Sequence, residues 1–183
     1  MKVLEFDKDF DEIVQSINNN KLVILPTDTV FGVVCKSKEK IYHLKQRDLN
    51  KKLIYFCSDI EQIDIKNKMF VDLAKQFWPG KLTIVFNKES YRIPNCSKIL
   101  KILKKTGKFY SSSANISNLN PYQNWEDYLN DKYFNQINDL ILIKGKTESE
   151  QGSTIYNLDT NEILRNGELT LALKEFLSKY QYQ

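Results

Sequence analysis

Hydrophobic and polar residues alternate along the chain with two periods, one typical of helices and one of strands. Between residues 8 and 19, Phe10, Ile13, Val14 and Ile17 recur at the spacing of an amphipathic helix. Short apolar runs such as KLVILP predict buried strands instead. The same criteria predict helices over residues 8–19, 37–46, 66–78, 97–106, 124–135 and 168–181. They predict strands over residues 21–26, 30–35, 52–57, 81–86, 91–93, 108–111, 139–144, 153–158 and 162–165.

This mixture of helices and strands predicts an α/β (α+β) fold with one twisted mixed sheet, parallel and antiparallel, flanked by helices. We expect a single domain over residues 1–183, because the length suits one buried core and no repeat or linker divides the chain. In such folds ligands bind beyond strand ends. The polar segments that follow strands are LPTDT, RIPN, SSSANIS, GST and LRNG.

Composition narrows the function only slightly. The chain is 42% hydrophobic and carries a net charge of +4, so it is globular and mildly basic. This charge fits an anionic ligand or RNA, and a solvated surface explains it equally well. No basic start followed by an apolar stretch and no apolar run near ~20 residues is present, so we expect a soluble cytoplasmic protein without a membrane contact.

Cysteine and histidine usage excludes several common sites. Cys35, Cys57 and Cys96 are far apart in sequence, which excludes a CxxC site and favours buried thiols. The one histidine, His43, lies inside a predicted helix without a nucleophile in its sequence context. The sequence contains no HExxH, GxxxxGK[ST] or GxGxxG pattern, so standard zinc and P-loop chemistry is set aside.

Cations at the ends of predicted elements are the remaining candidates for a binding site. Lys45 and Arg47 end a helix, and residues two apart share no helix face, so both reach one ligand only if the helix ends between or just after them. A solvated basic helix end is the simpler alternative. Arg92 and Arg165 each close a short strand before a turn, where arginine suits phosphate or carboxylate, or a surface ion pair.

Small hydroxyl residues follow several predicted strands. Thr27 and Thr29 could cap the next element or hold a small ligand. The segment KFYSSSANIS is unusually polar for its surroundings, while Trp78 is most simply a core aromatic at a helix end.

Seven motifs taken together are more specific than any one of them. LPTDTVFGVVC, LKQRDLNKKLI, FWPGKLTIVF, YRIP, SSSANIS, GSTIYNL and ILRNG occur in this order. The chain thereby resembles the YrdC-like family of threonylcarbamoyl-AMP synthases, in its short single-domain form. The resemblance extends from about residue 10 to residue 170. It implies a twisted sheet around a deep, basic cavity.

The resemblance also implies a reaction. Threonine and bicarbonate form a carbamate, which attacks the α-phosphate of ATP and releases pyrophosphate. The product, threonylcarbamoyl-AMP, would pass to tRNA threonylcarbamoyltransferase proteins that modify adenosine 37 of tRNA. A weak direct affinity for tRNA or another RNA is compatible with the basic cavity.

Residue roles follow from the matched motifs. The resemblance assigns ATP contacts to Lys45, Arg47, Ser113, Asn115 and Arg165. It assigns the threonine pocket to Thr27, Arg92, Ser111 and Ser153, with Arg92 as partner of the threonine carboxylate.

No dedicated catalytic base is expected, because the carbamate is already a nucleophile. Lys45 and Arg47 would act electrostatically, and positioning would supply most of the catalysis. Mg²⁺ is the expected cofactor, bound through the ATP phosphates, with Ser113 and Asn115 as candidate side-chain ligands.

Four positions depart from the usual family pattern: Asp48, Phe56, Ser112 and Asn166. Asp48, Ser112 and Asn166 stand where the family has proline, which loosens turns more than it removes ligands. Phe56 lies where a histidine is common.

Two other functions fit the same features. A non-catalytic RNA-binding module could use the basic cavity, and it predicts salt-sensitive RNA affinity. A different nucleotide-binding enzyme on the same fold is the third interpretation.

Overall fold

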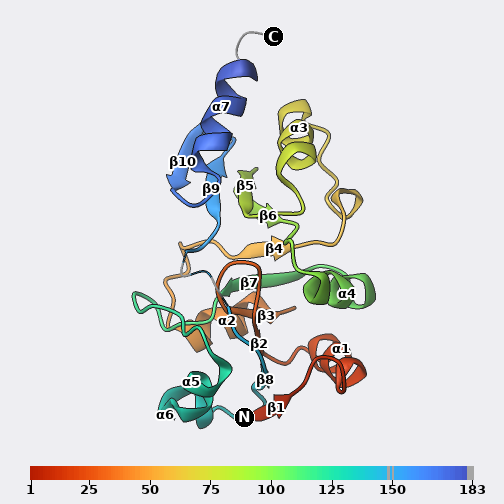
Figure 1. The fold of residues 1–183 in the computed structure, drawn as a ribbon, viewed down its shortest axis with the longest axis vertical. Coiled ribbons are helices and arrows are strands. Elements are labelled where there is room, and N and C mark those ends of the chain that lie inside the picture. Colours follow the sequence, from red (N-terminus) through yellow and green to blue (C-terminus); the bar gives the residue numbers. More distant parts are fainter. Residues whose placement is uncertain (148, 150, 181–183) are drawn as a thin grey trace.

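The structure, a computed structural model, describes residues 1–147, 149 and 151–180. Its strands form one sheet in the order β1-β8-β2-β3-β7-β4-β6-β5-β9-β10, which runs from the bottom of Figure 1 to the top. The strands are β1 (Lys2–Leu4), β2 (Val23–Leu25), β3 (Gly32–Cys35), β4 (Ile54–Phe56), β5 (Leu82–Phe86), β6 (Glu89–Arg92), β7 (Phe109–Ser113), β8 (Ile141–Ile143), β9 (Thr154–Asn157) and β10 (Glu162–Arg165). The pairs β1–β8, β2–β8, β4–β6 and β5–β9 are parallel and the others are antiparallel. The predicted mixed α/β sheet is confirmed.

Two helices cover part of one face of this sheet. The helices of the chain are α1 (Phe10–Asn18), α2 (Lys38–Lys45), α3 (Lys68–Phe77), α4 (Ser97–Thr106), α5 (Trp125–Asn130), α6 (Lys132–Asn135) and α7 (Thr170–Tyr180), with a 3-10 turn at Ile60–Gln62. Ile13 and Ile17 of α1 and Ile102 of α4 pack in one cluster with Phe56 and Phe109 of the sheet. In Figure 1, α1 and α4 lie to the right of the lower half of the sheet.

The opposite face is covered along more of its length. Helices α2, α5 and α6 contribute Ile41, Tyr128 and Phe134 to a second apolar cluster. Helices α3 and α7 contribute Phe70 and Leu173 to a third, on strands β5 and β9. Successive strand side chains point to opposite faces. No helix of the described residues contributes to a core cluster on the other face of β5, β6 and β9.

Three local features differ from the prediction. The predicted helix over 124–135 is two helices, because the Asp131 carboxylate accepts hydrogen bonds from the amides of Tyr133 (2.7 Å) and Phe134 (3.4 Å) and so caps a new helix. The predicted strand over 108–111 continues to Ser113, which pairs with Gly32. Strand β1 was missed because its three residues are too few for a periodic signal. Residue 181 of the last predicted helix lies outside the described residues.

The structure also places the histidine, the cysteines and Trp78 that the sequence analysis singled out. His43 is exposed on α2. Cys35 and Cys57 are buried free thiols, and Cys96 is free and half-buried. Trp78 is buried, and its indole N–H donates to the carbonyl of Leu82 at 2.6 Å. Within the part of the chain that the structure describes, no helix has the length and apolarity needed to cross a membrane.

Candidate functional site

A cavity of about 680 Å³ opens over the uncovered half-face of the sheet. The strand register places Ser111, Ile54 and Ser90 side by side on its floor. Val85 and Asn157, which follow in register on β5 and β9, extend the same row. The volume lies within the usual range of about 300–1,000 Å³ for small-molecule sites.

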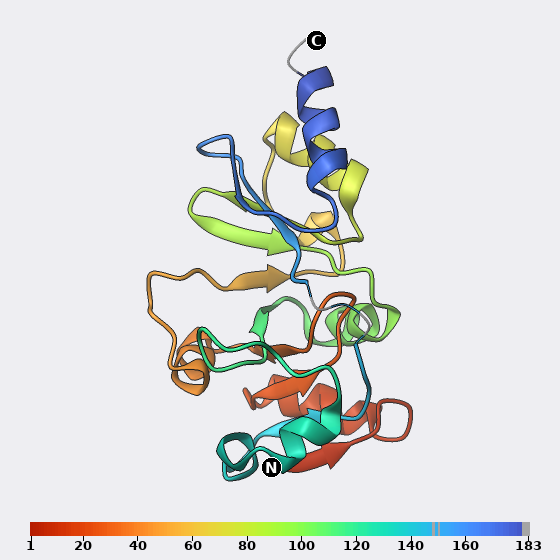
Figure 2. The ribbon, with the colours of Figure 1, turned by 60° about the vertical axis from the view of Figure 1, so that its left-hand side comes forward.

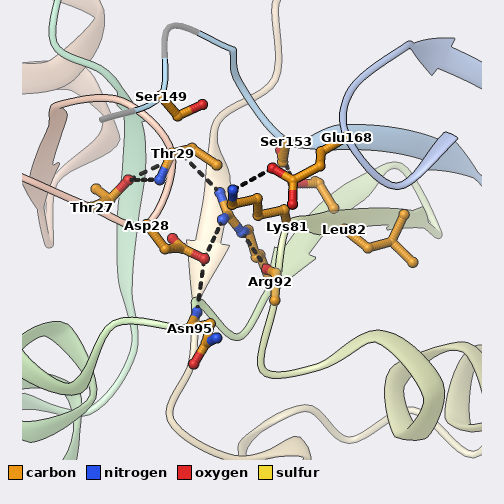
Figure 3. A network of polar contacts seen from close by, with 12 residues as sticks. Thr27, Asp28, Thr29, Lys81, Leu82, Arg92, Asn95, Ser149, Ser153 and Glu168 are labelled. Carbon is orange, nitrogen blue, oxygen red and sulfur yellow. Dashed lines mark hydrogen bonds and ion pairs between the residues drawn. The ribbon is translucent and has the colours of Figure 1, made fainter. Parts of the chain in front are cut away.

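Arg92, only 2% exposed, is the most deeply buried cation on the cavity wall (Figure 3). Its Nε donates to the carbonyl of Gly80 at 2.8 Å, and its Nη1 donates to Thr29 Oγ1 at 3.3 Å. Its Nη2 lies 2.8 Å from Asp28 Oδ2, and the same oxygen accepts a hydrogen bond from the Asn95 amide at 2.9 Å. Burial lowers the pKa of Arg92, and the charge of Asp28 acts in the opposite direction. The guanidinium is therefore held in one orientation at the cavity wall.

A chain of hydroxyls connects Arg92 to the loop after β2. Thr27 Oγ1 donates to the carbonyl of Val30 at 2.7 Å, so the 3.0 Å contact between the two threonine hydroxyls has Thr29 as donor. Thr27 Oγ1 also accepts from the Thr29 amide at 3.0 Å. A Cβ at Gly32 would lie 3.1 Å from the Thr27 methyl group, so the small residue allows this close approach.

Ser153 and Arg165 meet at the β9–β10 side of the cavity. Arg165 Nε donates to the Ser153 carbonyl at 2.8 Å and Nη2 donates to Ser153 Oγ at 3.0 Å. The same hydroxyl is 2.7 Å from Thr83 Oγ1. The pKa of Arg165 is lowered first by desolvation and then by the positive charges of Arg92 and Arg47. These three arginines therefore act on one another through the cavity.

Helix α2 ends at Lys45, with Gln46 in a left-handed conformation at φ 47°. This is the helix end that the sequence required for Lys45 and Arg47 to reach one ligand, but the two side chains lie in different surroundings. Arg47 lines the cavity, where its Nε donates to the Lys51 carbonyl at 3.1 Å and its Nη2 donates to the Lys52 carbonyl at 3.0 Å.

Lys45 instead lies beneath the loop after β7 and is 1% exposed. Its ammonium donates to the Ser113 carbonyl, to the Asn115 carbonyl at 2.5 Å and to Asn115 Oδ1 at 3.1 Å. Burial, and secondarily the charge of Arg47, lowers the pKa of Lys45 to about 7. Three acceptors match its three protons, so Lys45 fixes the Ser113–Asn115 backbone.

The Asn115 side chain is also occupied within its own loop. While Oδ1 accepts from Lys45, its Nδ2 donates to the carbonyls of Ile116 (2.8 Å) and Leu119 (2.6 Å). Of the residues predicted from the sequence, the cavity lining contains Thr27, Arg47, Arg92, Ser111, Ser113, Ser153 and Arg165. Lys45 and Asn115 adjoin the cavity through Ser113 and are not part of its lining.

Several lining residues were missed by the sequence analysis. Thr83 and Ser90 face the cavity from strands β5 and β6, and their polar character at alternate strand positions was an available signal. Lys52 and Lys88 come from the segments before β4 and β6. Nothing in their local sequence indicates that they line one cavity.

The lining has a strong charge imbalance. Among the residues that the structure describes, the lining contains six cations, Arg47, Lys51, Lys52, Lys88, Arg92 and Arg165, and one acid, Asp159. Among the described residues, no group of three or more His, Cys, Asp or Glu side chains could hold a metal ion. A site of this kind attracts anionic ligands and stabilises negative charge that develops within it.

Comparison with known proteins assigns the chain to a family. A family model for Sua5, YciO and YrdC proteins, described as telomere recombination, matches residues 15–167. The chain is 36% identical over 160 residues to an uncharacterized protein of Mycoplasma pneumoniae, with 87% of this chain and 35% of the relative covered. It is 28% identical over 176 residues to threonylcarbamoyl-AMP synthase of Buchnera aphidicola, with 81% of this chain and 98% of that protein covered. The chain thus spans about a third of the length of its mycoplasma relative.

Solved structures agree with this assignment. A variant of P. abyssi Sua5 superposes with a TM-score of 0.83 at 26% identity, over 94% of this chain and 62% of Sua5. Sua5 complexed with L-threonine superposes with a TM-score of 0.72, over 81% of this chain and 50% of Sua5. Since the family model matches most of the chain, the protein belongs to the Sua5/YciO/YrdC family.

Proposed function

We propose that the protein is an L-threonylcarbamoyladenylate synthase, a nucleotidyltransferase that uses ATP, L-threonine and bicarbonate. The observation that carries this proposal is the cavity itself, where the described lining combines the buried Arg92 with five other cations, one acid and several small hydroxyl residues. All three substrates are anions or carry a carboxylate, so one basic cavity suits them together. The name of the Buchnera relative and the L-threonine complex of Sua5 support the same activity.

The proposed chemistry needs no side-chain base. The threonine amine and bicarbonate condense to a carbamate with loss of water. A carbamate oxygen then attacks the α-phosphorus of ATP. The bond from that phosphorus to the bridging oxygen breaks, and its electron pair leaves with pyrophosphate. The protein would align the two anions and offset their charges, and alignment of this kind contributes up to roughly 7–11 kcal/mol in favourable cases.

Residue roles follow from position in the cavity. Arg92 would pair with the threonine carboxylate, because its guanidinium is buried and oriented by Asp28 and Thr29. Thr27, Ser111 and Ser153, the other residues assigned to threonine, line the same cavity.

On the nucleotide side, Arg47, Ser113 and Arg165 would contact ATP directly. Lys45 and Asn115 would act through the loop that carries Ser113, because their polar atoms already bind each other and that loop. A direct contact between Lys45 and ATP stays a prediction.

Mg²⁺ would enter with ATP, because the described part of the lining offers one carboxylate, that of Asp159, and both of its oxygens accept backbone amides. When bound, the ion would neutralise phosphate charge. Of the two candidate side-chain ligands, Ser113 and Asn115, the Ser113 hydroxyl is the better placed, since the Asn115 amide already makes hydrogen bonds within its loop. Transfer to tRNA by partner proteins would follow outside this cavity.

Pyrophosphate release from ATP tests the proposal. Purified protein with Mg²⁺ and ATP should release pyrophosphate only when both L-threonine and bicarbonate are present, and Arg92→Gln should raise the KM for threonine more than the KM for ATP. Release that ignores threonine would overturn the proposal in favour of another nucleotide-binding enzyme. Salt-sensitive RNA binding without turnover would overturn it in favour of a non-catalytic module.

A further inference from the structure

Two lysines to which the resemblance assigns no role line the same cavity. Lys52 and Lys88 each lie two residues before Ile54 and Ser90, which pair in register between the parallel strands β4 and β6. Lys52 precedes β4 and Lys88 lies in the β5–β6 turn with φ 64°, so the position of both side chains is given by the cavity lining and not by strand alternation. Both are exposed and line the cavity.

The same register includes Ser113. Strands β7 and β4 are antiparallel, and Ser111 pairs with Ile54. The end of β7 at Ser113 therefore lies on the same side of the sheet as the start of β4, which Lys52 precedes. Ser113, Lys52 and Lys88 therefore lie at or just beyond strand ends on the same side of the sheet, and all three line the cavity. Figure 2 shows the segments that carry these residues projecting to the same side of the molecule, the left.

The backbone of each lysine is fixed by a neighbouring side chain. Both oxygens of the Asp159 carboxylate accept amides of the β5–β6 turn, from Asn87 at 3.0 Å and Lys88 at 3.2 Å. Arg47 Nη2 donates to the Lys52 carbonyl. Asp159 thus holds the turn that carries Lys88, and Arg47 holds the segment that carries Lys52.

The two ammonium groups have no ion-pair partner among the described residues. Lys81, which precedes β5, does have such a partner, the carboxylate of Glu168. Asp159 is the acid of the described lining, and its two oxygens accept hydrogen bonds from the amides of Asn87 and Lys88. Two unpaired cations on anchored backbone, at the open edge of an anion site, are suited to a ligand with more than one negative charge.

We propose that Lys52 and Lys88 bind the terminal phosphates of the nucleotide, the pair that leaves as pyrophosphate. This inference rests on the proposed function for the identity of the nucleotide. Ser113 would meet the inner phosphates, and the exposed Lys52 and Lys88 would hold the outer ones on the solvent side. Asp159 is a positioning residue for Lys88 and does not touch the ligand.

Calorimetric titration with three separate ligands tests the subsite: sodium pyrophosphate, ATP and AMP. In Lys52→Gln/Lys88→Gln, affinity for pyrophosphate and ATP should fall about 10-fold or more, as expected for lost hydrogen bonds between charged groups. Affinity for AMP, which lacks the outer phosphates, should change by less than about 2-fold. An equal loss for AMP would overturn the assignment to the terminal phosphates.

A matched control separates direct contact from long-range attraction. Lys66 and Lys104 are exposed and lie outside the cavity lining, so Lys66→Gln/Lys104→Gln removes the same charge. If this control loses as much pyrophosphate affinity as the cavity variant, the subsite is overturned. Loss of affinity for a single-stranded RNA oligonucleotide without loss for pyrophosphate would also overturn it.

Asp159→Ala provides a second readout. General electrostatics predicts tighter pyrophosphate binding when an acid is removed, whereas loss of the anchor for Lys88 predicts weaker binding. Weaker binding supports the positioning role, and tighter binding overturns it. The two proposals can fail separately. If the wild type shows no threonine-dependent turnover, but Lys52→Gln/Lys88→Gln still loses pyrophosphate affinity, the proposed function is wrong and the phosphate subsite is supported.

Discussion

Arg92 and Asp28 form a buried ion pair at the wall of the cavity, with Nη2 2.8 Å from Oδ2. The side chain of Asp28 is 7% exposed and that of Arg92 is 2% exposed, so water screens their charges poorly. The second carboxylate oxygen of Asp28 has no hydrogen-bond partner among the described residues. Asp28 therefore serves mainly to hold and neutralise Arg92, the cation that we assign to the threonine carboxylate.

Asp28→Asn should weaken both stability and threonine binding. The substitution keeps the side-chain shape but leaves the Arg92 charge uncompensated, and removal of one partner of a buried pair costs about 3–5 kcal/mol. Denaturant unfolding should show this loss, and the KM for threonine should rise. The exposed Asp64 provides the control Asp64→Asn, which should change neither. Unchanged stability and KM in Asp28→Asn would contradict a positioning role.

Lys45 predicts a distinctive dependence of stability on pH. Its pKa in the folded protein is lowered to about 7 from the ordinary 10.5, so the unfolded chain binds more protons between these values. Stability contributed at this residue is therefore lowest below pH 7 and rises as pH increases toward 10.5. The slope is at most about 1.4 kcal/mol per pH unit, and the three oxygens that favour the charged ammonium reduce it.

Lys45→Met isolates this effect, because the other titrating groups are common to both proteins. The free energy of unfolding of the wild type minus that of the variant should increase between pH 7 and pH 10, as measured by urea denaturation. A difference that stays constant or falls over this range would show that Lys45 stays charged in the folded protein.

Ser113 and Ser117 provide a matched pair of substitutions in one loop. Ser113 lines the cavity, whereas the Ser117 hydroxyl is buried without a hydrogen-bond partner among the described residues. Ser113→Ala should weaken ATP binding roughly 10-fold or more, since a hydrogen bond to a charged group contributes about 1.5–3 kcal/mol. Ser117→Ala should leave ATP affinity unchanged. Equal ATP affinity in the two variants, measured by calorimetry, would remove Ser113 from the nucleotide site.

The sequence was sufficient for most of the fold because the relevant signals are local. Apolar spacing in residues 8–19 predicts α1, and short apolar runs predict the central strands. The break at Asp131 was missed because the apolar pattern continues across it, while its capping hydrogen bonds to Tyr133 and Phe134 divide the helix. Within the segment KFYSSSANIS, Phe109–Ser113 form strand β7 and the residues after Ser113 form a loop.

The site was predictable only where residues carry a motif or an obvious polar signal. Lys45 shows the limit. Its position two residues before Arg47 left a shared ligand and a solvated helix end both open, and the resemblance assigned it to ATP, but its ammonium binds the Ser113 carbonyl in the structure. Lys52 and Lys88 depend on the pairing of β4 with β6, strands separated by a long stretch of chain. Such pairing is a tertiary property, so no local pattern could bring these lysines together.

Gly152 provides a test of Arg165 that leaves the arginine itself in place. A Cβ at this position would lie 2.7 Å from Nη2 and 2.8 Å from Cζ of Arg165. The atoms it meets are the far end of a flexible side chain, so the guanidinium can move away at little cost to the fold. We therefore expect Gly152→Ala to keep a near-native melting temperature while its ATP affinity falls.

A double-variant cycle decides whether this fall acts through Arg165. If Gly152→Ala works by displacing the guanidinium from Ser153, adding it to Arg165→Ala should cause almost no further loss of ATP affinity. The two hydrogen bonds from Arg165 to Ser153 would already be absent in the arginine variant. Additive losses in the double variant, measured by calorimetry under one salt condition, would instead mean that Gly152 affects the nucleotide by a separate route, such as close approach of its backbone to the ligand.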